Sequence, residues 1–137
     1  MTIRTVIANS SKGDQIIILD HWALEMKDLQ EVLLRNKPKI IHFAGHGYHN
    51  SSNDESGLML ETNSGKPSPL PFGKLIDLLQ FIVKITEVQC IVLNGCYTEA
   101  LFNHINMSIG CRMIGMSNTI KDIFAIAFSK GFYLGLA

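Results

Sequence analysis

The sequence predicts an α/β fold with one mainly parallel sheet, helices on both faces of that sheet, and a small hairpin. Short apolar runs typical of buried strands alternate with longer stretches of helical periodicity, which is the pattern of parallel sheets. A turn signature separates two short strand-like segments and predicts the hairpin. The length of 137 residues suits one domain with one hydrophobic core, so we expect a single domain over residues 1–137.

Four runs predict the strands of the sheet: residues 15–20 (QIIILD), 39–44 (KIIHFA), 89–93 (QCIVL) and 112–116 (RMIGM). Helical spacing predicts helices over residues 26–33, 72–84, 99–104 and 120–128, and Pro38 favours an end of the first helix just before it. The hairpin is expected from residues 57–61 and 67–70, which flank Asn63-Ser64-Gly65. Residues 51–56 (SSNDES) are polar and predict an exposed loop.

Composition excludes several classes of partner. The chain has 12 basic and 12 acidic residues, whereas nucleic acids and anionic membrane surfaces require a basic excess. No apolar stretch reaches the length of a membrane span, and the N-terminus lacks the apolar core of a signal peptide. The three cysteines are an odd number without CxxC spacing, which favours free thiols in a reducing, cytoplasmic setting. We therefore expect a protein or peptide partner.

Two of the predicted strands end in residues that carry chemistry. One runs into Gly45-His46-Gly47 and the other into Asn94-Gly95-Cys96. Glycines beside a reactive residue let the backbone turn sharply and come close to a substrate. Because the carboxyl ends of parallel strands meet at one edge of a sheet, we expect these two segments to lie side by side.

A histidine and a cysteine in this arrangement predict nucleophilic catalysis. Cys96 would attack a carbonyl as its thiolate, with His46 as the base and the N-terminus of the following helix lowering the thiol pKa. The backbone N–H groups of Gly47 and Cys96 could form an oxyanion hole, and His46 could protonate the leaving amine. This chemistry needs no metal and no organic cofactor.

The order of the two residues separates this site from other cysteine enzymes. His46 comes first and Cys96 follows 50 positions later, as in caspases. Papain-like enzymes have the opposite order. Glutamine amidotransferases usually have glycine where Thr98 stands, and tyrosine phosphatases need an arginine where Phe102 stands.

The residues around the pair resemble the CHAT domain, a caspase relative often found with tetratricopeptide repeats. Residues 42–47 (HFAGHG) and 92–98 (VLNGCYT) resemble the family's HFxGHG and VLNxCYS/T motifs. Residues 57–61 (GLMLE), 114–116 (IGM) and 122–128 (DIFAIAF) are similar to further family motifs, so the resemblance runs from about residue 15 to the C-terminus. It implies a caspase-like sandwich, a cysteine peptidase of clan CD, and a tetratricopeptide-repeat or other activating partner.

The N-terminal part of the sequence departs from the family pattern. CHAT domains normally have a further strand and a full helix before the equivalent of Gln15, and residues 1–9 suffice only for the tail of that helix. We therefore expect a compact or truncated domain that lacks the first strand. A sheet edge left unpaired in this way invites association with another strand.

Two residues are candidates for substrate binding. The family resemblance implies that Asp122 could face the cleft and bind a basic residue before the scissile bond; alternatively, it could be an acid stabilised by the dipole at a helix N-terminus. Tyr97 could line the cleft or cap the helix that follows it.

Plainer interpretations stand beside the catalytic one. Cys96 could be an inert buried thiol, as we expect of Cys90 and Cys111. His42, His46 and His49 are close enough in sequence for a zinc site, but few carboxylates stand near them to support it. The sequence as a whole favours a cysteine endopeptidase that cleaves selected proteins through a Cys96–His46 dyad; the alternative is a catalytically silent CHAT-type interaction or regulatory module.

Overall fold

The computed structural model describes residues 8–9, 16–19, 21, 25–62, 64–96, 98, 111–116 and 121–136. The chain divides into two compact units, one made of residues 1–22 and 120–137 and the other of residues 23–119. The second unit carries every strand that the structure describes.

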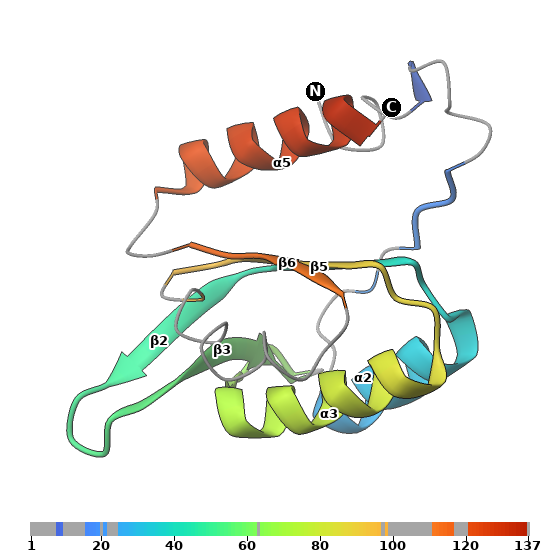
Figure 1. The fold of residues 1–137 in the computed structure, drawn as a ribbon. Helices are drawn as coiled ribbons and strands as arrows, with labels where there is room; N and C mark the ends of the chain where they lie inside the picture. The colour runs from blue at the N-terminus through green and yellow to red at the C-terminus, as the bar shows by residue number, and fades with distance from the viewer. Residues whose placement is uncertain are drawn as a thin grey trace. The chain divides into compact units, whose positions relative to one another are not determined.

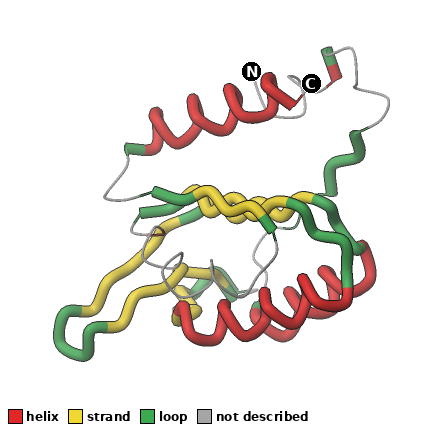
Figure 2. Tube along the Cα trace, viewed as in Figure 1, coloured by secondary structure: helices red, strands yellow, loops and turns green. Residues whose placement is uncertain are grey.

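Nine helices and strands are described (Figures 1 and 2). In chain order they are α2 (Met26–Asn36), β1 (Ile40–Ala44), β2 (His46–Asn50), β3 (Glu55–Glu61), β4 (Pro67–Pro71), α3 (Phe72–Ile85), β5 (Cys90–Asn94), β6 (Arg112–Ile114) and α5 (Asp122–Leu136). No helix of these ranges is long and apolar enough to cross a membrane.

The α/β class is confirmed, with a parallel sheet and the expected hairpin of β3 and β4, to which β2 adds a third strand. A parallel sheet has the strand order β1-β5-β6, and an antiparallel sheet has the order β2-β3-β4. In the first, Ile41 lies opposite Ile91; in the second, Leu58 lies between Gly47 and Leu70. The sequence did not predict β2, because a histidine between two glycines is typical of a turn.

One hydrophobic core joins both sheets to α2 and α3. Figure 1 shows these two helices together on the same side of the parallel sheet. α3 supplies Leu75, Leu79 and Ile82, which are fully buried. They share the core with apolar residues of α2 and of both sheets: Leu29, Leu33, Ile41, Leu58, Leu70, Ile91 and Leu93. Since each buried aliphatic side chain stabilises a fold by about 1.5–3 kcal/mol, this core fixes the two sheets against the same helices.

Local signals in the sequence predicted several boundaries correctly. α2 ends at Lys37, which is left-handed (φ 44°) and donates its N–H to the carbonyl of Leu33, just before Pro38. The hairpin of β3 and β4 closes through a turn in which Gly65 has a φ of +78°, a value that glycine adopts without strain.

One predicted strand is wrong and one predicted helix lies outside the described residues. Residues 16–19 have no regular secondary structure, and Ile17 and Leu19 are 85% and 57% exposed. A short apolar run marks a segment that tends to be buried, but a strand also needs a partner, and no described strand pairs with this segment. The helix expected over residues 99–104 falls on residues that are not described.

Candidate active site

The two segments predicted to carry the chemistry meet at one end of the parallel sheet. β1 and β5 are parallel neighbours, and Ala44 lies opposite Asn94 at their carboxyl ends. One residue further, the N–H of Gly45 donates to the carbonyl of Asn94 at 3.3 Å. The expected juxtaposition of the two strand ends is confirmed.

Beyond these ends the two backbones come into direct contact at glycines. A side chain at Gly47 would overlap the carbonyl oxygen of Cys96, and its Cβ would lie 2.8 Å from the carbonyl carbon. A Cβ at Gly95 would lie 2.9 Å from the carbonyl oxygen of Gly45. Only residues without side chains fit here, and their contact holds the segment containing His46 against the one containing Cys96.

The pairing of the antiparallel sheet fixes the direction of the Gly47 backbone. Pro69 lies opposite Met59 and has no N–H, so this pair cannot exchange two hydrogen bonds. In β3, the residues that exchange backbone hydrogen bonds with β4 are then Leu58 and Leu60. The N–H and C=O groups of Gly57 and Met59 point to the other side, toward β2.

It follows that Gly47 and His49 direct their N–H and C=O groups away from β3. Their register partners in β3 are Leu58 and Ser56, whose own N–H and C=O groups point away from β2. The backbone N–H of Gly47 therefore points to the same side of the chain as the N–H of Gly45, which donates to a carbonyl at the end of β5. In agreement, a Cβ at Gly95 would lie 3.5 Å from the nitrogen of Gly47. The Gly47 N–H lies on the side of the Gly95–Cys96 turn.

The structure places the candidate side chains as follows. His46 is the first residue of β2 and is exposed, and Cys96 lies in the turn after β5 and is half-buried. Tyr97 lies outside the described residues. Asp122 begins α5, in the other compact unit, and only its backbone is described.

Thr98 supports this turn, a role that sequence reasoning missed. Its side chain is fully buried, and its hydroxyl lies 2.9 Å from the carbonyl oxygens of both Leu93 and Gly95, to which it donates. The same hydroxyl accepts the N–H of Met116 at 2.8 Å. Thr98 thus links the end of β5 to the segment after β6. The signal in the sequence was the small polar residue that ends the VLNxCYS/T-like motif, two positions after Cys96.

The remaining cysteines are in surroundings that favour the neutral thiol. Burial raises the pKa of Cys90, although the nearby Arg112 partly opposes this. Burial also raises the pKa of Cys111, and the proximity of Cys90 adds to the effect. Cys111 packs against the core, in line with the interpretation of these two residues as structural.

His42 lies in β1, in the strand that leads to His46. Burial lowers its pKa from the ordinary value of 6.5, because a charged imidazolium loses its hydration in the sheet. Among the described residues, no group of three or more His, Cys, Asp or Glu side chains is placed to hold a metal ion.

A comparison with models of protein families shows to which family the chain belongs. The family model of the CHAT domain matches residues 3–137. The chain belongs to the CHAT domain family. The resemblance seen in the motifs is thereby confirmed over nearly the whole sequence. No curated protein matches the chain.

Gly47 and Gly45 offer a matched test of the contact between the two strand ends. Gly47→Ala should destabilise the CHAT domain by about 1–3 kcal/mol, because the new methyl group overlaps the backbone of Cys96. Gly45→Ala should be tolerated, since nothing lies within 4 Å of a Cβ there. Urea unfolding measures both, and equal stability of the two variants would contradict the contact.

His42 should make the stability of the domain depend on pH. Its pKa is lower in the folded protein than the value of 6.5 in the unfolded chain, so the unfolded chain binds more protons as the pH falls below 6.5. The free energy of unfolding should therefore decrease between pH 7.5 and 5.5, by at most about 1.4 kcal/mol per pH unit for one proton. His42→Gln should reduce this decrease; a decrease that this variant retains in full would exclude His42 as its source.

Proposed function

We propose that this CHAT domain is a cysteine endopeptidase that hydrolyses peptide bonds of selected protein substrates with Cys96 as nucleophile and His46 as base. The observation that carries the proposal is the backbone contact between Gly47 and Cys96 at the carboxyl ends of β1 and β5. Family membership adds support, because CHAT domains are caspase-like.

Each catalytic group would act on a particular atom of Cys96 or of the substrate. His46 takes the proton of Cys96, and the thiolate Sγ attacks the substrate carbonyl carbon to form a C–S bond. The negative carbonyl oxygen accepts hydrogen bonds from the N–H groups of Gly47 and Cys96. When the C–N bond breaks, His46 gives its proton to the leaving amine. A water molecule then hydrolyses the thioester with His46 as base, and the thiol is restored.

Two residues are candidates for substrate selection. Asp122 is the candidate acid for a lysine or arginine before the scissile bond, and Tyr97 is the candidate to line the cleft. An acid at such a position favours a basic residue, because a desolvated charge needs a partner. A tetratricopeptide-repeat or other partner protein would activate the enzyme, in a reducing compartment such as the cytoplasm.

Selective alkylation tests the dyad without knowledge of the substrate. At pH 7, iodoacetamide should label Cys96 at least about tenfold faster than Cys90 or Cys111, because only a thiolate reacts and burial raises the pKa of the other two thiols. His46→Ala should slow the labelling of Cys96 itself at least about tenfold, whereas His49→Ala, three residues further along β2, should leave that rate unchanged. Peptide mapping by mass spectrometry gives the three rates.

Two outcomes would contradict the proposal that this domain is an enzyme. Equal rates for all three thiols, or a fast Cys96 that does not depend on His46, would leave no activated pair. The chain would then be a CHAT-type interaction or regulatory module.

A further inference from the structure

The parallel pairing of β5 and β6 stops where its next backbone hydrogen bond is expected. The N–H of Arg112 donates to the carbonyl of Gln89 at 3.0 Å, and the register continues to the end of β6. In a parallel ladder the bonds recur every two residues, so the N–H of Met116 should donate to the carbonyl of Leu93. The structure shows another partner for both of these groups.

That partner is the hydroxyl of Thr98. It accepts the N–H of Met116 at 2.8 Å, and it lies 2.9 Å from the carbonyl oxygen of Leu93, to which it donates. Two hydrogen bonds through one oxygen atom thus replace a single bond between the backbones, as a bridging water would do. The hydroxyl is inserted between β5 and the segment after β6.

The same hydroxyl also holds the residue before Cys96. It lies 2.9 Å from the carbonyl oxygen of Gly95, and alternate carbonyls of an extended chain point to the same side. The carbonyl of Asn94 points to the other side and accepts the N–H of Gly45. The end of β5 is therefore held from both sides. Because a peptide unit is planar, fixing the Gly95 carbonyl also fixes the Cα atom of Cys96.

Burial means that water cannot take the place of this hydroxyl. Thr98 and Leu93 have no exposed surface, and Gly95 is buried. Valine has nearly the shape of threonine and would fill the same space, so the three backbone groups would lose their shared partner. Serine would retain the hydroxyl and lose only a methyl group.

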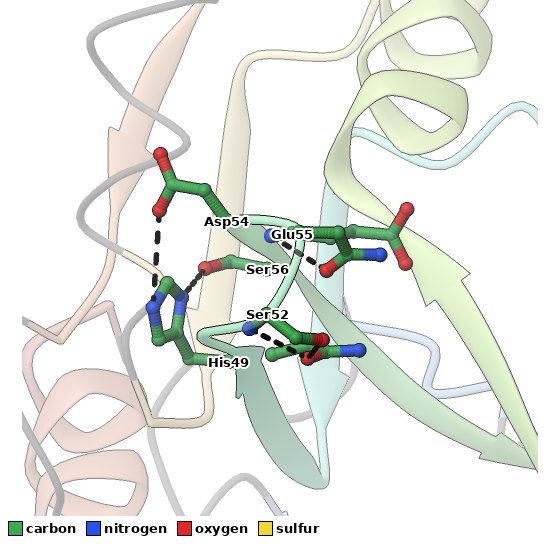
Figure 3. Close-up of polar contacts among 7 residues, drawn as sticks. His49, Ser52, Asp54, Glu55 and Ser56 are labelled. Atoms are coloured by element: carbon green, nitrogen blue, oxygen red, sulfur yellow. Dashed lines mark hydrogen bonds and ion pairs between the residues drawn. The ribbon is translucent and has the colours of Figure 1, made fainter.

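The strand that begins with His46 is held by other contacts. β2 pairs with β3 along its whole length. Figure 3 shows His49 between Ser56 and Asp54, with 2.7 Å from its Nδ1 to Ser56 Oγ and 3.8 Å from its Nε2 to Asp54 Oδ1. Thr98 takes part in none of these contacts, so the loss of its hydroxyl should displace Cys96 and leave β2 in place.

We infer that Thr98 is a positioning residue, whose hydroxyl fixes Cys96 beside the first residue of β2 and ties it to the segment after β6. A displacement of Met116 would reach Cys96 through a single oxygen atom. The inference rests on the proposed function for the catalytic use of Cys96, but not for its position.

A disulfide between position 46 and Cys96 measures this position without catalysis, because His46 is absent. In the full chain carrying His46→Cys, Cys90→Ala and Cys111→Ala, equilibrium with glutathione gives the effective concentration of the two remaining thiols. The addition of Thr98→Val should lower this concentration at least about tenfold, whereas Thr98→Ser should keep it within about threefold.

Thr86 provides a matched control. Its hydroxyl donates to the carbonyl of Ile82 at 2.6 Å, at the C-terminal end of α3, so Thr86→Val removes a similar hydrogen bond that takes no part in the Cys96 turn. This variant should also stay within about threefold of the parent. An equal loss in Thr86→Val and Thr98→Val would overturn the inference, as would an unchanged value in Thr98→Val or the absence of the disulfide in the parent.

The inserted hydroxyl can also be observed in the unaltered chain, which decides the point if Thr98→Val does not fold. By NMR, the hydroxyl proton of Thr98 should exchange slowly and should show a nuclear Overhauser effect to the amide proton of Met116, because both protons lie on one buried oxygen. A Met116 amide without this contact would overturn the insertion.

Alkylation connects the position of Cys96 to its reactivity. In the otherwise natural chain at pH 7, Thr98→Val should slow the labelling of Cys96 by iodoacetamide at least about tenfold, and Thr98→Ser and the labelling of Cys90 should remain unchanged. If His46→Ala leaves the labelling of Cys96 unchanged, the proposed function fails and the disulfide still decides this inference. If the disulfide is insensitive to Thr98→Val, this inference fails and the His46→Ala result still decides the proposed function.

Discussion

The structure depends on one constraint, the direct contact between two pieces of backbone at Gly45–Gly47 and Gly95–Cys96. Any side chain at Gly47 would occupy the position of the Cys96 carbonyl group. The contact brings a histidine and a cysteine from distant parts of the sequence to the same end of a parallel sheet. Proton transfer between a histidine and a cysteine acts over hydrogen-bond distances. The two residues must therefore lie close together before a lowered thiol pKa or a helix dipole can contribute to reactivity.

The chain changes its pairing partner between β1 and β2, at this contact. β1 pairs with β5 in the parallel sheet, and after Gly45 the chain pairs with β3 in the antiparallel sheet. Since β5 ends at Asn94, the side of β2 that faces Cys96 has no neighbour among the described strands. The shared core with α2 and α3 holds the two sheets, and buried Thr98 ties the turn after β5 to the segment after β6. The segments that contain His46 and Cys96 thus meet where one sheet ends and the other begins.

Local signals in the sequence predicted most of the elements correctly. Pro38 and Gly65 predicted a helix end and a turn, and the apolar runs of β1 and β5 predicted parallel neighbours. The pattern could not predict β2, because its glycine and polar residues form a strand only through pairing with β3. The prediction of a strand from the apolar run at residues 16–19 failed for the opposite reason, since the run favours a strand but pairs with no strand that the structure describes. Long-range partners such as Met116 for Thr98 leave no local signal at all.

The most direct measurement of the central claim is a disulfide between position 46 and Cys96. In a background carrying Cys90→Ala and Cys111→Ala, His46→Cys should form a disulfide with Cys96 under mild oxidation, because bridged residues need Cα atoms within about 7 Å. His49→Cys, further along β2, should not form it. The account predicts a cross-linked peptide by mass spectrometry for the first variant alone. The absence of that cross-link, while both thiols still react with a maleimide, would contradict it.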